Sequence, residues 1–413
     1  MNKSDTDCLI VGGGIGGAVL ALALALAQKA KRITIVEREL SPPTAGRPEI
    51  LASSTVRIFH QLGIGKQLLA EAAIPLKGLQ AWYSESRELI LEFNEHDFSR
   101  AQVQPYSTNP AKTRQLLLEA AEKFPSVVVR RGIDIKQLLF KNQKVVGAEG
   151  IFGKESIQFR SQLVVGDDGS HSKIRSSLGI TLKPKDFAFV FLAAAGNLLP
   201  GQSDQIGQVW LNPKNLKKCL FAGIFMPQPD RRGAFVFLMT QKVYEHYSQA
   251  PSSEFYAAAQ DLSPLCADME KEYQFPKHFH IFKRPFGHSK KYVSEGVALI
   301  GDAAHPVTPV GGQGANMSIA DAVSLAQSIE ADLETKGDVR FESLKSYERE
   351  RHPANQRSVN FSRYADFVFR LLLLFPFLSP LLVQFVKMIN QNENFKTGFL
   401  QAVSRTFLSR KIN

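Results

Sequence analysis

The sequence predicts an α/β fold in which a parallel-sheet domain is interleaved with a mostly antiparallel second sheet and followed by C-terminal helices. Three observations predict it. A strand, a glycine-rich turn and a helix occupy residues 8–27, apolar stretches separated by turns fill 75–104 and 183–285, and a further buried strand, loop and helix follow at 297–333. Because strand–loop–helix units stand on both sides of the second sheet, the parallel domain is expected to be discontinuous.

Composition is that of an ordinary globular protein, with 413 residues, 44% hydrophobic and 22% charged residues. This length suits two domains. Cys8, Cys219 and Cys266 lie far apart, which excludes a disulfide framework and predicts a reducing compartment. The net charge of +11 is spread along the chain without a nucleic-acid-binding motif, so we expect no nucleic-acid partner. We expect no metal site either, because His278 and His280 have no third ligand nearby.

The first motif is the stretch DCLIVGGGIGG, residues 7–17. Gly12 permits a tight turn, Gly14 lets the backbone approach a pyrophosphate, and Gly17 lets the following helix pack closely on the sheet. Ile15 and Gly16 lie between them, where free helix N–H groups are aimed at the anion. Strand, turn and helix in this order predict a dinucleotide site.

A second strand, RITIVE, ends at Glu37, twenty residues after Gly17, and Arg38 follows it at the same site. The Glu37 carboxylate is placed to accept hydrogen bonds from a ribose diol and to repel a 2′-phosphate, which favours FAD or NAD over NADP. The apolar helix after the turn is read as a retained core helix of a cytoplasmic protein rather than a signal peptide, because Asp5 and Asp7 precede it.

The middle of the chain alternates between the two domains. Residues 75–104 predict an antiparallel hairpin, and residues 109–124 an amphipathic helix with Asn109 as its N-cap. Strands are expected at 144–152 and 157–166. The predicted boundaries are 1–74, 105–182 and 286–360 for the first domain, 75–104 and 183–285 for a substrate domain, and 361–413 for a C-terminal helical extension.

Two further motifs complete the candidate site. In LVVGDDGSHSKIR a strand ends before the Asp168–Gly169 turn, and in LIGDAAHPVTPVGGQGANMSIADA a strand ends on Asp302. A carboxylate there can accept hydrogen bonds from a polyol, and a helix N-terminus can stabilise an anionic ring such as reduced flavin. The motifs together predict FAD, with its ring system against the loop and helix start formed by Gly312, Gly314, Ala315 and Asn316.

At residues 5–360 the sequence resembles the FAD-dependent aromatic hydroxylases of the para-hydroxybenzoate hydroxylase type, with ubiquinone-pathway and polyketide hydroxylases as the most similar subgroups. The resemblance implies a Rossmann-like FAD-binding domain of the glutathione reductase type. It implies that Arg175 belongs to the motif of Asp168, that Arg47 contacts the flavin, and that Arg114 helps to hold the pyrophosphate region.

The resemblance also implies the reaction. NADH or NADPH, bound only transiently, reduces the flavin, O2 adds to give a flavin C4a-hydroperoxide, and oxygen is transferred to an aromatic or polycyclic, lipophilic small molecule. No catalytic residue is assigned, since no residue pair stands out as a general base, and His305 is expected to fix its loop. The aromatic residues Trp210, Phe221, Phe225 and Phe237 are candidate pocket walls or core. The alternatives are a flavin-dependent reductase or halogenase on the same fold, and a non-catalytic FAD-binding protein.

The tail is very apolar at residues 370–388, but Pro376 and Pro380 interrupt it, which argues against a transmembrane helix. Two alternatives stay open: a helical cap packed on the core, and a peripheral contact with a membrane or a lipid substrate, which the nearby Arg and Lys residues favour. The sequence leaves the oligomeric state open between monomer and homodimer.

Overall fold

The structure is a computed structural model that describes residues 2–28, 30, 32–41, 48–213, 219–283, 285–334 and 339–405. It contains an eight-stranded, a seven-stranded and a three-stranded sheet within these ranges.

The eight-stranded sheet has a parallel centre. Its strands pair in the order β18, β11, β1, β2, β8, all parallel, while β9, β10 and β17 add antiparallel pairs. The central strands are near-continuous apolar runs because helices cover both faces of such a sheet. The bounds are β1 Asn2–Val11, β2 Ile33–Glu37, β8 Val127–Arg131, β9 Ile133–Lys141, β10 Lys144–Phe152, β11 Glu155–Gly166, β17 Val293–Ser294 and β18 Val297–Leu299.

Helices α1 (Ile15–Ala27), α5 (Pro110–Glu122) and α10 (Gly314–Glu334) share one hydrophobic core with this sheet. Helix α1 begins directly after Gly14, which is extended and acts as its N-cap. The predicted cap of α5 is confirmed, since the Asn109 side chain accepts a hydrogen bond from Lys112 N at 3.2 Å. A short helix, α6 (Lys173–Ser177), follows β11.

A small sheet and three short helices lie between the two large sheets in sequence. Strand β7 pairs antiparallel with both β3 and β4. The bounds are β3 Glu49–Leu51, β4 Ala73–Pro75, β7 Tyr106–Thr108, α2 Ser53–Gln61, α3 Gly65–Glu71 and α4 Glu95–Ala101.

The seven-stranded sheet joins the predicted hairpin to the second domain. Strands β5 and β6 form the antiparallel hairpin, and β5 then pairs parallel with β13, whereas the other pairs are antiparallel. The strand order is β16, β12, β15, β14, β13, β5, β6. The bounds are β5 Gly78–Tyr83, β6 Glu88–Asn94, β12 Val190–Asn197, β13 Ile206–Leu211, β14 Ala222–Gln228, β15 Arg232–Met239 and β16 His280–Phe282.

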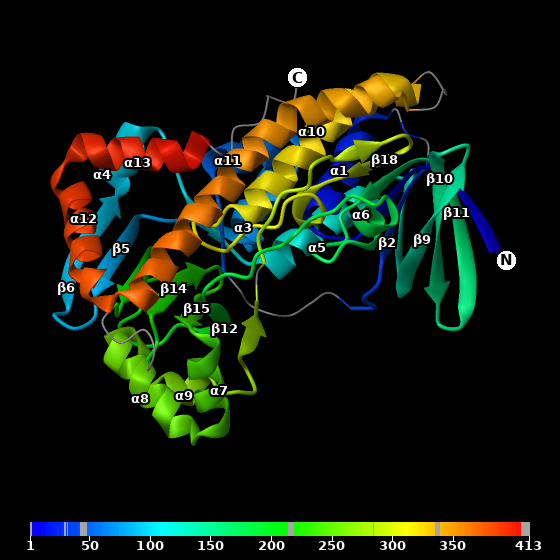
Figure 1. The fold of residues 1–413 in the computed structure, drawn as a ribbon. Helices are drawn as coiled ribbons and strands as arrows, with labels where there is room; N and C mark the ends of the chain where they lie inside the picture. Colours follow the sequence, from blue (N-terminus) through cyan, green and yellow to red (C-terminus); the bar gives the residue numbers. More distant parts are fainter. Residues whose placement is uncertain are drawn as a thin grey trace.

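One face of this sheet is covered by α7 (Gln241–Gln249), α8 (Ser252–Leu262), η1 (Pro264–Cys266) and α9 (Met269–Glu272). The other face packs against Val310 and the last turns of α11 (Phe341–Leu374). Figure 1 shows the two sheets as separate lobes, with α11 running from one to the other. The α/β fold predicted from the sequence is confirmed.

The C-terminal region consists of α11, η3 (Pro376–Leu378), α12 (Ser379–Gln391) and α13 (Glu393–Arg405). The boundary expected after residue 360 lies inside α11, so this region begins without a break in the helix. In the part of the chain that the structure describes, no single helix is long and apolar enough to cross a bilayer. The pair Phe341–Leu374 and Pro376–Gln391 meets that test only jointly, and it bends by 116°.

Candidate cofactor site

Four strands end at the same edge of the parallel sheet, and each predicted motif follows one of them. The first glycine turn follows β1, Glu37 ends β2, Asp168 lies two residues after β11, and η2 (Gly301–Ala303), which carries Asp302, follows β18. Because the strands are parallel, their carboxyl ends meet, and this edge is where open α/β sheets bind ligands. The tertiary structure therefore brings the three sequence motifs together.

The glycine turn is a cradle that side chains would fill. Gly12 has φ +109°, and a Cβ there would lie 2.2 Å from the backbone oxygen of Asp167. A Cβ on Gly14 would lie 2.6 Å from Asp167 Oδ2, and one on Gly17 2.4 Å from Gly12 O. The turn thus needs glycine at all three positions, as expected where backbone must approach a phosphate.

Ile15 and Gly16 form the first turn of α1, whose leading N–H groups have no partner inside the helix. Gly17 N is not free in this way, because it donates a hydrogen bond to Asp167 Oδ2 at 2.8 Å. The start of α1 therefore has the free N–H groups that an anion site needs, and Asp167 lies beside them.

Glu37 and Arg114 form an ion pair beside this turn, although 77 residues separate them. Arg114 Nη2 lies 2.9 Å from Glu37 Oε2, and both side chains are mostly buried. Glu37 also accepts Gly13 N at 3.0 Å, and Arg114 Nε donates to Gly13 O. Burial lowers the pKa of Arg114 from its ordinary value, an effect that the nearby Glu37 charge opposes. The pair fixes the turn from the side of β2 and α5.

The two other predicted arginines of the N-terminal part differ in position. Arg38 is exposed and pairs with Glu39, with Nη2 3.1 Å from Glu39 Oε1. Arg47 lies outside the described residues.

One carboxylate oxygen of Asp168, in the second motif, has no hydrogen-bond partner among the described residues. Its Oδ2 accepts the backbone N–H groups of Lys173 at 2.7 Å and Ile174 at 3.1 Å, so it caps α6, whereas its buried Oδ1 has no hydrogen-bond partner among the described residues. Burial raises the pKa of Asp168. Such an orphaned acceptor fits a ligand hydroxyl, because buried polar atoms are otherwise paired.

Arg175 ties the second motif to the third. Its Nη1 donates to Ala303 O at 2.7 Å and its Nη2 to Ser170 O at 3.0 Å, and the residue is buried. Ala303 lies in η2, so this arginine fixes the spacing between the Asp168 turn and the half-buried Asp302.

The loop before α10 is shaped by Gly311 and Gly312, with φ +84° and +63°. Gly314 and Ala315 open the helix. The Asn316 side chain is fully used within the protein: its Oδ1 accepts Ala52 N at 2.9 Å and Thr55 Oγ1 at 2.6 Å. Its Nδ2 donates to Ile50 O at 2.8 Å and Gly312 O at 3.0 Å. Asn316 therefore holds the loop against β3 and α2, and only its backbone can face a ligand.

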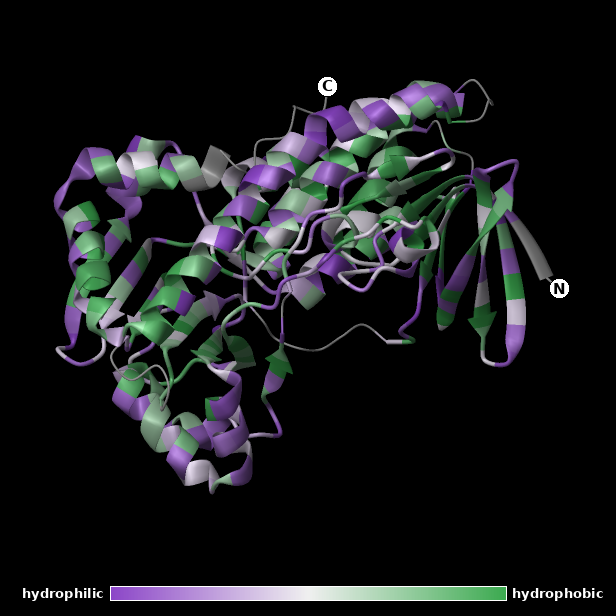
Figure 2. Cartoon of the chain, in the orientation of Figure 1, coloured by the Kyte–Doolittle hydropathy of each residue, from purple (hydrophilic) through white to green (hydrophobic). Residues whose placement is uncertain are grey.

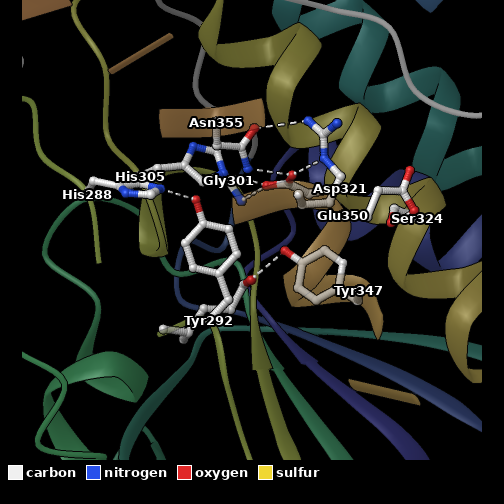
Figure 3. A network of polar contacts seen from close by, with 11 residues as sticks. His288, Tyr292, Gly301, His305, Asp321, Ser324, Tyr347, Glu350 and Asn355 are labelled. Carbon is white, nitrogen blue, oxygen red and sulfur yellow. Dashed lines mark hydrogen bonds and ion pairs between the residues drawn. The ribbon is translucent and has the colours of Figure 1, made fainter. Parts of the chain in front are cut away.

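A buried polar network supports the turn of Asp302 from behind (Figure 3). Asp321, on α10, accepts Gly301 N at 3.1 Å, Arg351 Nε at 2.8 Å and Asn355 Nδ2 at 2.8 Å, and contacts His305 Nε2. The nearby His305 and Arg351 lower the pKa of Asp321 although burial opposes them. His305 thus has the structural surroundings expected from the sequence.

The network continues through Tyr292 and His288, whose Oη and Nε2 are 2.6 Å apart. The ring of His288 also packs 4.2 Å from that of His352. Burial, and the positive charge that His352 would carry, lower the pKa of His288 to about 3. Sequence reasoning missed this network and Asp167. The signals in the sequence were Asp167, the first acid in GDDG, and Asp321, seven residues after Gly314.

The aromatic residues proposed as pocket walls lie on opposite faces of the seven-stranded sheet. Phe221 faces the loop of Val310 and packs with Phe189 at 4.8 Å and Phe369 at 5.2 Å between ring centroids. The other three point to the opposite face, under α7 and α8: Trp210, Phe225 and Phe237. Phe221 lies just before β14, so the alternation of side chains along that strand does not apply to it. These three are therefore core of the second domain, as the alternative expectation held.

Comparison with known proteins now decides the family. The model of the FAD binding domain family matches residues 5–362, which is most of the chain. The chain belongs to this FAD binding domain family. Its glycine cradle, the orphaned Asp168 acceptor and the open helix N-terminus fit FAD, a molecule with a pyrophosphate, hydroxyl groups and a ring that becomes anionic on reduction.

Relatives within the family are hydroxylases of different aromatic compounds. The chain is 24% identical over 346 residues to 3-demethoxyubiquinol 3-hydroxylase of Escherichia coli strain K12, covering 79% of this chain and 80% of that one. It is 24% identical over 362 residues to 6-methylpretetramide 4-monooxygenase of Streptomyces rimosus, covering 86% and 82%. The crystal structure of p-nitrophenol 4-monooxygenase from Pseudomonas putida DLL-E4 superposes with a TM-score of 0.81 at 16% identity over both full chains. These comparisons confirm the predicted family, the FAD cofactor and the flavin monooxygenase class.

Proposed function

We propose that this flavoprotein hydroxylates an apolar aromatic or polycyclic small molecule with NADH or NADPH and O2. One observation carries the substrate class: the sheet face that packs against Val310, in the loop before α10, is a buried cluster rich in aromatic rings that includes Phe189, Phe221 and Phe369. A wall of this kind favours a neutral, lipophilic substrate, because a charged group placed there would lose its hydration without a partner.

The residues at the carboxyl edge have the following proposed roles. Gly12, Gly14, Ile15, Gly16 and Gly17 hold the pyrophosphate. Glu37 and Arg38 bind the adenosine ribose, and Glu37 keeps acceptor capacity for it because a carboxylate can accept about four hydrogen bonds. The ribitol and ring system are assigned to Asp168, Asp302, Gly312, Gly314, Ala315 and Asn316, with Arg114 and Arg47 as flanking cations.

The proposed domains follow the predicted boundaries. Segments 1–74, 105–182 and 286–360 supply the cofactor site, and 75–104 with 183–285 supply the substrate sheet, in agreement with the sheets that their strands enter. Bound FAD supplies the redox and oxygen chemistry. The chain itself orients the substrate against the loop and excludes water with its aromatic face.

Spectroscopy and turnover test this proposal. The purified protein is expected to show a flavin spectrum, and a lipophilic phenol is expected to stimulate NADH or NADPH oxidation in air and to give a product heavier by one oxygen. Stimulation without halide separates a hydroxylase from a halogenase. If the protein binds flavin but no phenol in the panel stimulates oxygen uptake, the hydroxylase proposal is overturned and the FAD assignment stays intact.

Two matched variants locate the substrate. Phe221 and Phe225 are equally buried but face opposite sides of the same sheet. Phe221→Leu is expected to raise the KM for the stimulating phenol at least about fivefold, and Phe225→Leu to leave it within about twofold, since one lost ring contact is worth about 1 kcal/mol. Equal effects of the two variants on KM would contradict the assignment of the pocket to the Phe221 face.

We further propose that residues 370–388 contact an anionic membrane surface peripherally. Five side chains, which we call the apolar ridge, are between 47% and 74% exposed: Leu374, Phe377, Leu381, Phe385 and Met388. Phe377 lies in η3, the spacing of Leu381, Phe385 and Met388 places these three on one face of α12, and Figure 2 shows hydrophobic residues along this helix. Residues 370–391 contain no acidic residue, and the chain carries a net charge of +11, which favours anionic lipid.

The ridge adjoins the proposed substrate face. Leu378 of η3 and Leu382 of α12 pack against the aromatic cluster, as do Leu372 and Leu373 of α11. Asp366 ties the last turns of α11 to the segment just before β12. Its Oδ2 pairs with Lys185 Nζ of that segment at 2.8 Å and with Arg370 Nε of α11 at 2.9 Å. A lipophilic molecule could therefore pass from a bilayer to the pocket along one continuous apolar surface.

Vesicle co-sedimentation tests the membrane contact. Wild type is expected to sediment with phosphatidylcholine–phosphatidylglycerol vesicles more than with phosphatidylcholine alone, and Phe377→Ser/Leu381→Ser to bind at least about tenfold more weakly. The control is Phe152→Ser, which removes a 49% exposed ring from the end of β10, in the sheet at the far end of the molecule (Figure 1). Unchanged vesicle binding by the double variant would contradict the proposal. So would a wild type that binds no vesicles and forms a dimer that the double substitution converts to a monomer.

A further inference from the structure

Asp167 lies where the three cofactor motifs meet, and none of the proposed roles uses its side chain. Its backbone N donates to Val11 O at 2.8 Å, which places the residue beside the end of β1. Its Oδ2 accepts Gly17 N at 2.8 Å across 150 residues of sequence. Its Oδ1 would lie 3.2 Å from a Cβ on Gly16 and 3.1 Å from a Cβ on Gly301, and Ser318 Oγ would lie closer to both. One carboxyl group thus touches the α1 turn and the η2 turn at once.

Asp167 as a whole residue is half-buried, and it follows β11 at the edge of the sheet where we propose that FAD binds. This position matters because Gly14, whose backbone a pyrophosphate must approach, has its missing Cβ only 2.6 Å from Asp167 Oδ2. A group so close to the phosphate cradle must either bind the cofactor or oppose it.

Charge decides between these two. Asp167 is surrounded by three further carboxyl groups, Asp302 from η2, Asp168 from the adjoining turn and Glu37 from β2, whereas Arg114 from α5 is the cation whose charge it feels. Four carboxylates and a pyrophosphate cannot all be ionised at one edge without strong repulsion. Burial and these like charges raise the pKa of Asp167 well above its ordinary value, although the Gly17 hydrogen bond and the charge of Arg114 oppose the shift.

We propose that Asp167 binds FAD as a neutral carboxylic acid, which accepts the Gly17 N–H on one oxygen and donates its own O–H to the phosphate–ribitol chain of the cofactor. A carboxylic acid offers this one donor, which a carboxylate does not. The inference rests on FAD binding at this edge. It makes Asp167 a cofactor-positioning residue that connects the glycine turn to the turn of Asp302.

The test uses full-length apoprotein at pH 7.5, with FAD affinity measured by the quenching of flavin fluorescence. Asp167→Asn keeps an acceptor for Gly17 N and a donor for FAD, so its Kd is expected within about threefold of wild type. Asp167→Ala loses both and is expected to bind at least about tenfold more weakly, the loss of one hydrogen bond to a charged group. Asp204→Asn, an exposed acid in the second domain, is the control.

Infrared difference spectra report the protonation state directly and do not depend on folding stability. We expect wild type to show the C=O stretch of a protonated carboxyl that is missing from Asp167→Asn and that shifts when FAD binds. No such band, a band that FAD leaves unmoved, Asn binding FAD tenfold more tightly than wild type, or Ala binding as tightly as wild type would each overturn the inference. Failure of wild type itself to bind FAD would instead contradict the cofactor assignment.

Discussion

At the first glycine turn, what matters most is the atom that Gly14 lacks. Its φ of −67° is one that any residue adopts, so glycine is required there for space and not for backbone freedom. Gly12 differs, because its φ of +109° and its contact with backbone both demand glycine. Glycine is therefore needed for space at Gly14 and for both space and backbone conformation at Gly12.

Gly14→Ala is the variant that separates cofactor binding from folding. The new Cβ would lie 2.6 Å from Asp167 Oδ2, a side-chain atom that can shift, so we expect FAD affinity to fall at least about tenfold while the Tm of the apoprotein changes by only a few degrees. Flavin titration and thermal unfolding measure the two. Gly398→Ala, where a Cβ meets nothing within 4 Å, is the control: we expect it to leave FAD affinity unchanged and to raise the Tm slightly, because alanine favours the interior of α13 more than glycine does.

Between elements, Asp321 is the junction of η2, α10 and α11. It binds Gly301 N in the first, lies on the second, and pairs with Arg351 and Asn355 of the third. All three side chains are at most 1% exposed. The helix pair and the Asp302 turn are thus positioned by one charged centre that the hydrophobic pattern could not reveal.

Removal of that centre is expected to be costly. Asp321→Ala leaves Arg351 buried without its partner, so we expect the free energy of unfolding to fall by about 3 to 5 kcal/mol. Urea unfolding measures it, with Asp321→Asn as a milder variant in case the first fails to fold. Ser328→Ala, on the same helix outside the network, should cost less than about 0.5 kcal/mol. A loss for Asp321→Ala no larger than for Ser328→Ala would contradict this role.

For the molecule as a whole, the buried network makes stability depend on pH. The pKa of His288 is about 3 in the folded chain against 6.5 for an ordinary histidine. Between these values the unfolded chain binds a proton that the folded chain does not, so stability is full above pH 6.5 and is lost as the pH falls toward 3. The lowered pKa of Asp321 acts in the same direction.

His288→Gln is expected to flatten this dependence. One proton contributes at most about 1.4 kcal/mol per pH unit to the slope of unfolding free energy, and the part-exposed His288 should contribute less. Urea unfolding at pH 7.5, 6.0 and 5.0 measures the slope for wild type and variant. His246→Gln, an exposed histidine paired with Glu254, serves as the comparison. Equal slopes for wild type and His288→Gln would show that another group dominates.

The sequence by itself determined the α/β fold, the motifs at Gly12 to Gly17, Glu37, Asp168 and Asp302, and through them the FAD site. These signals are local: a strand, a turn and a helix cap are read within about twenty residues. Because the carboxyl ends of parallel strands must meet, local order alone placed the motifs together.

Only the tertiary structure decided the rest. The Asn316 side chain hydrogen-bonds to Ile50 and Ala52. Trp210 faces away from the loop before α10. Asp167 contacts Gly17, 150 residues away in the sequence. The apolar tail at residues 370–388 is divided among the end of α11, η3 and α12, and part of it forms the exposed apolar ridge. Each of these depends on which distant surfaces pack together, and packing partners far apart in sequence leave no periodicity to read.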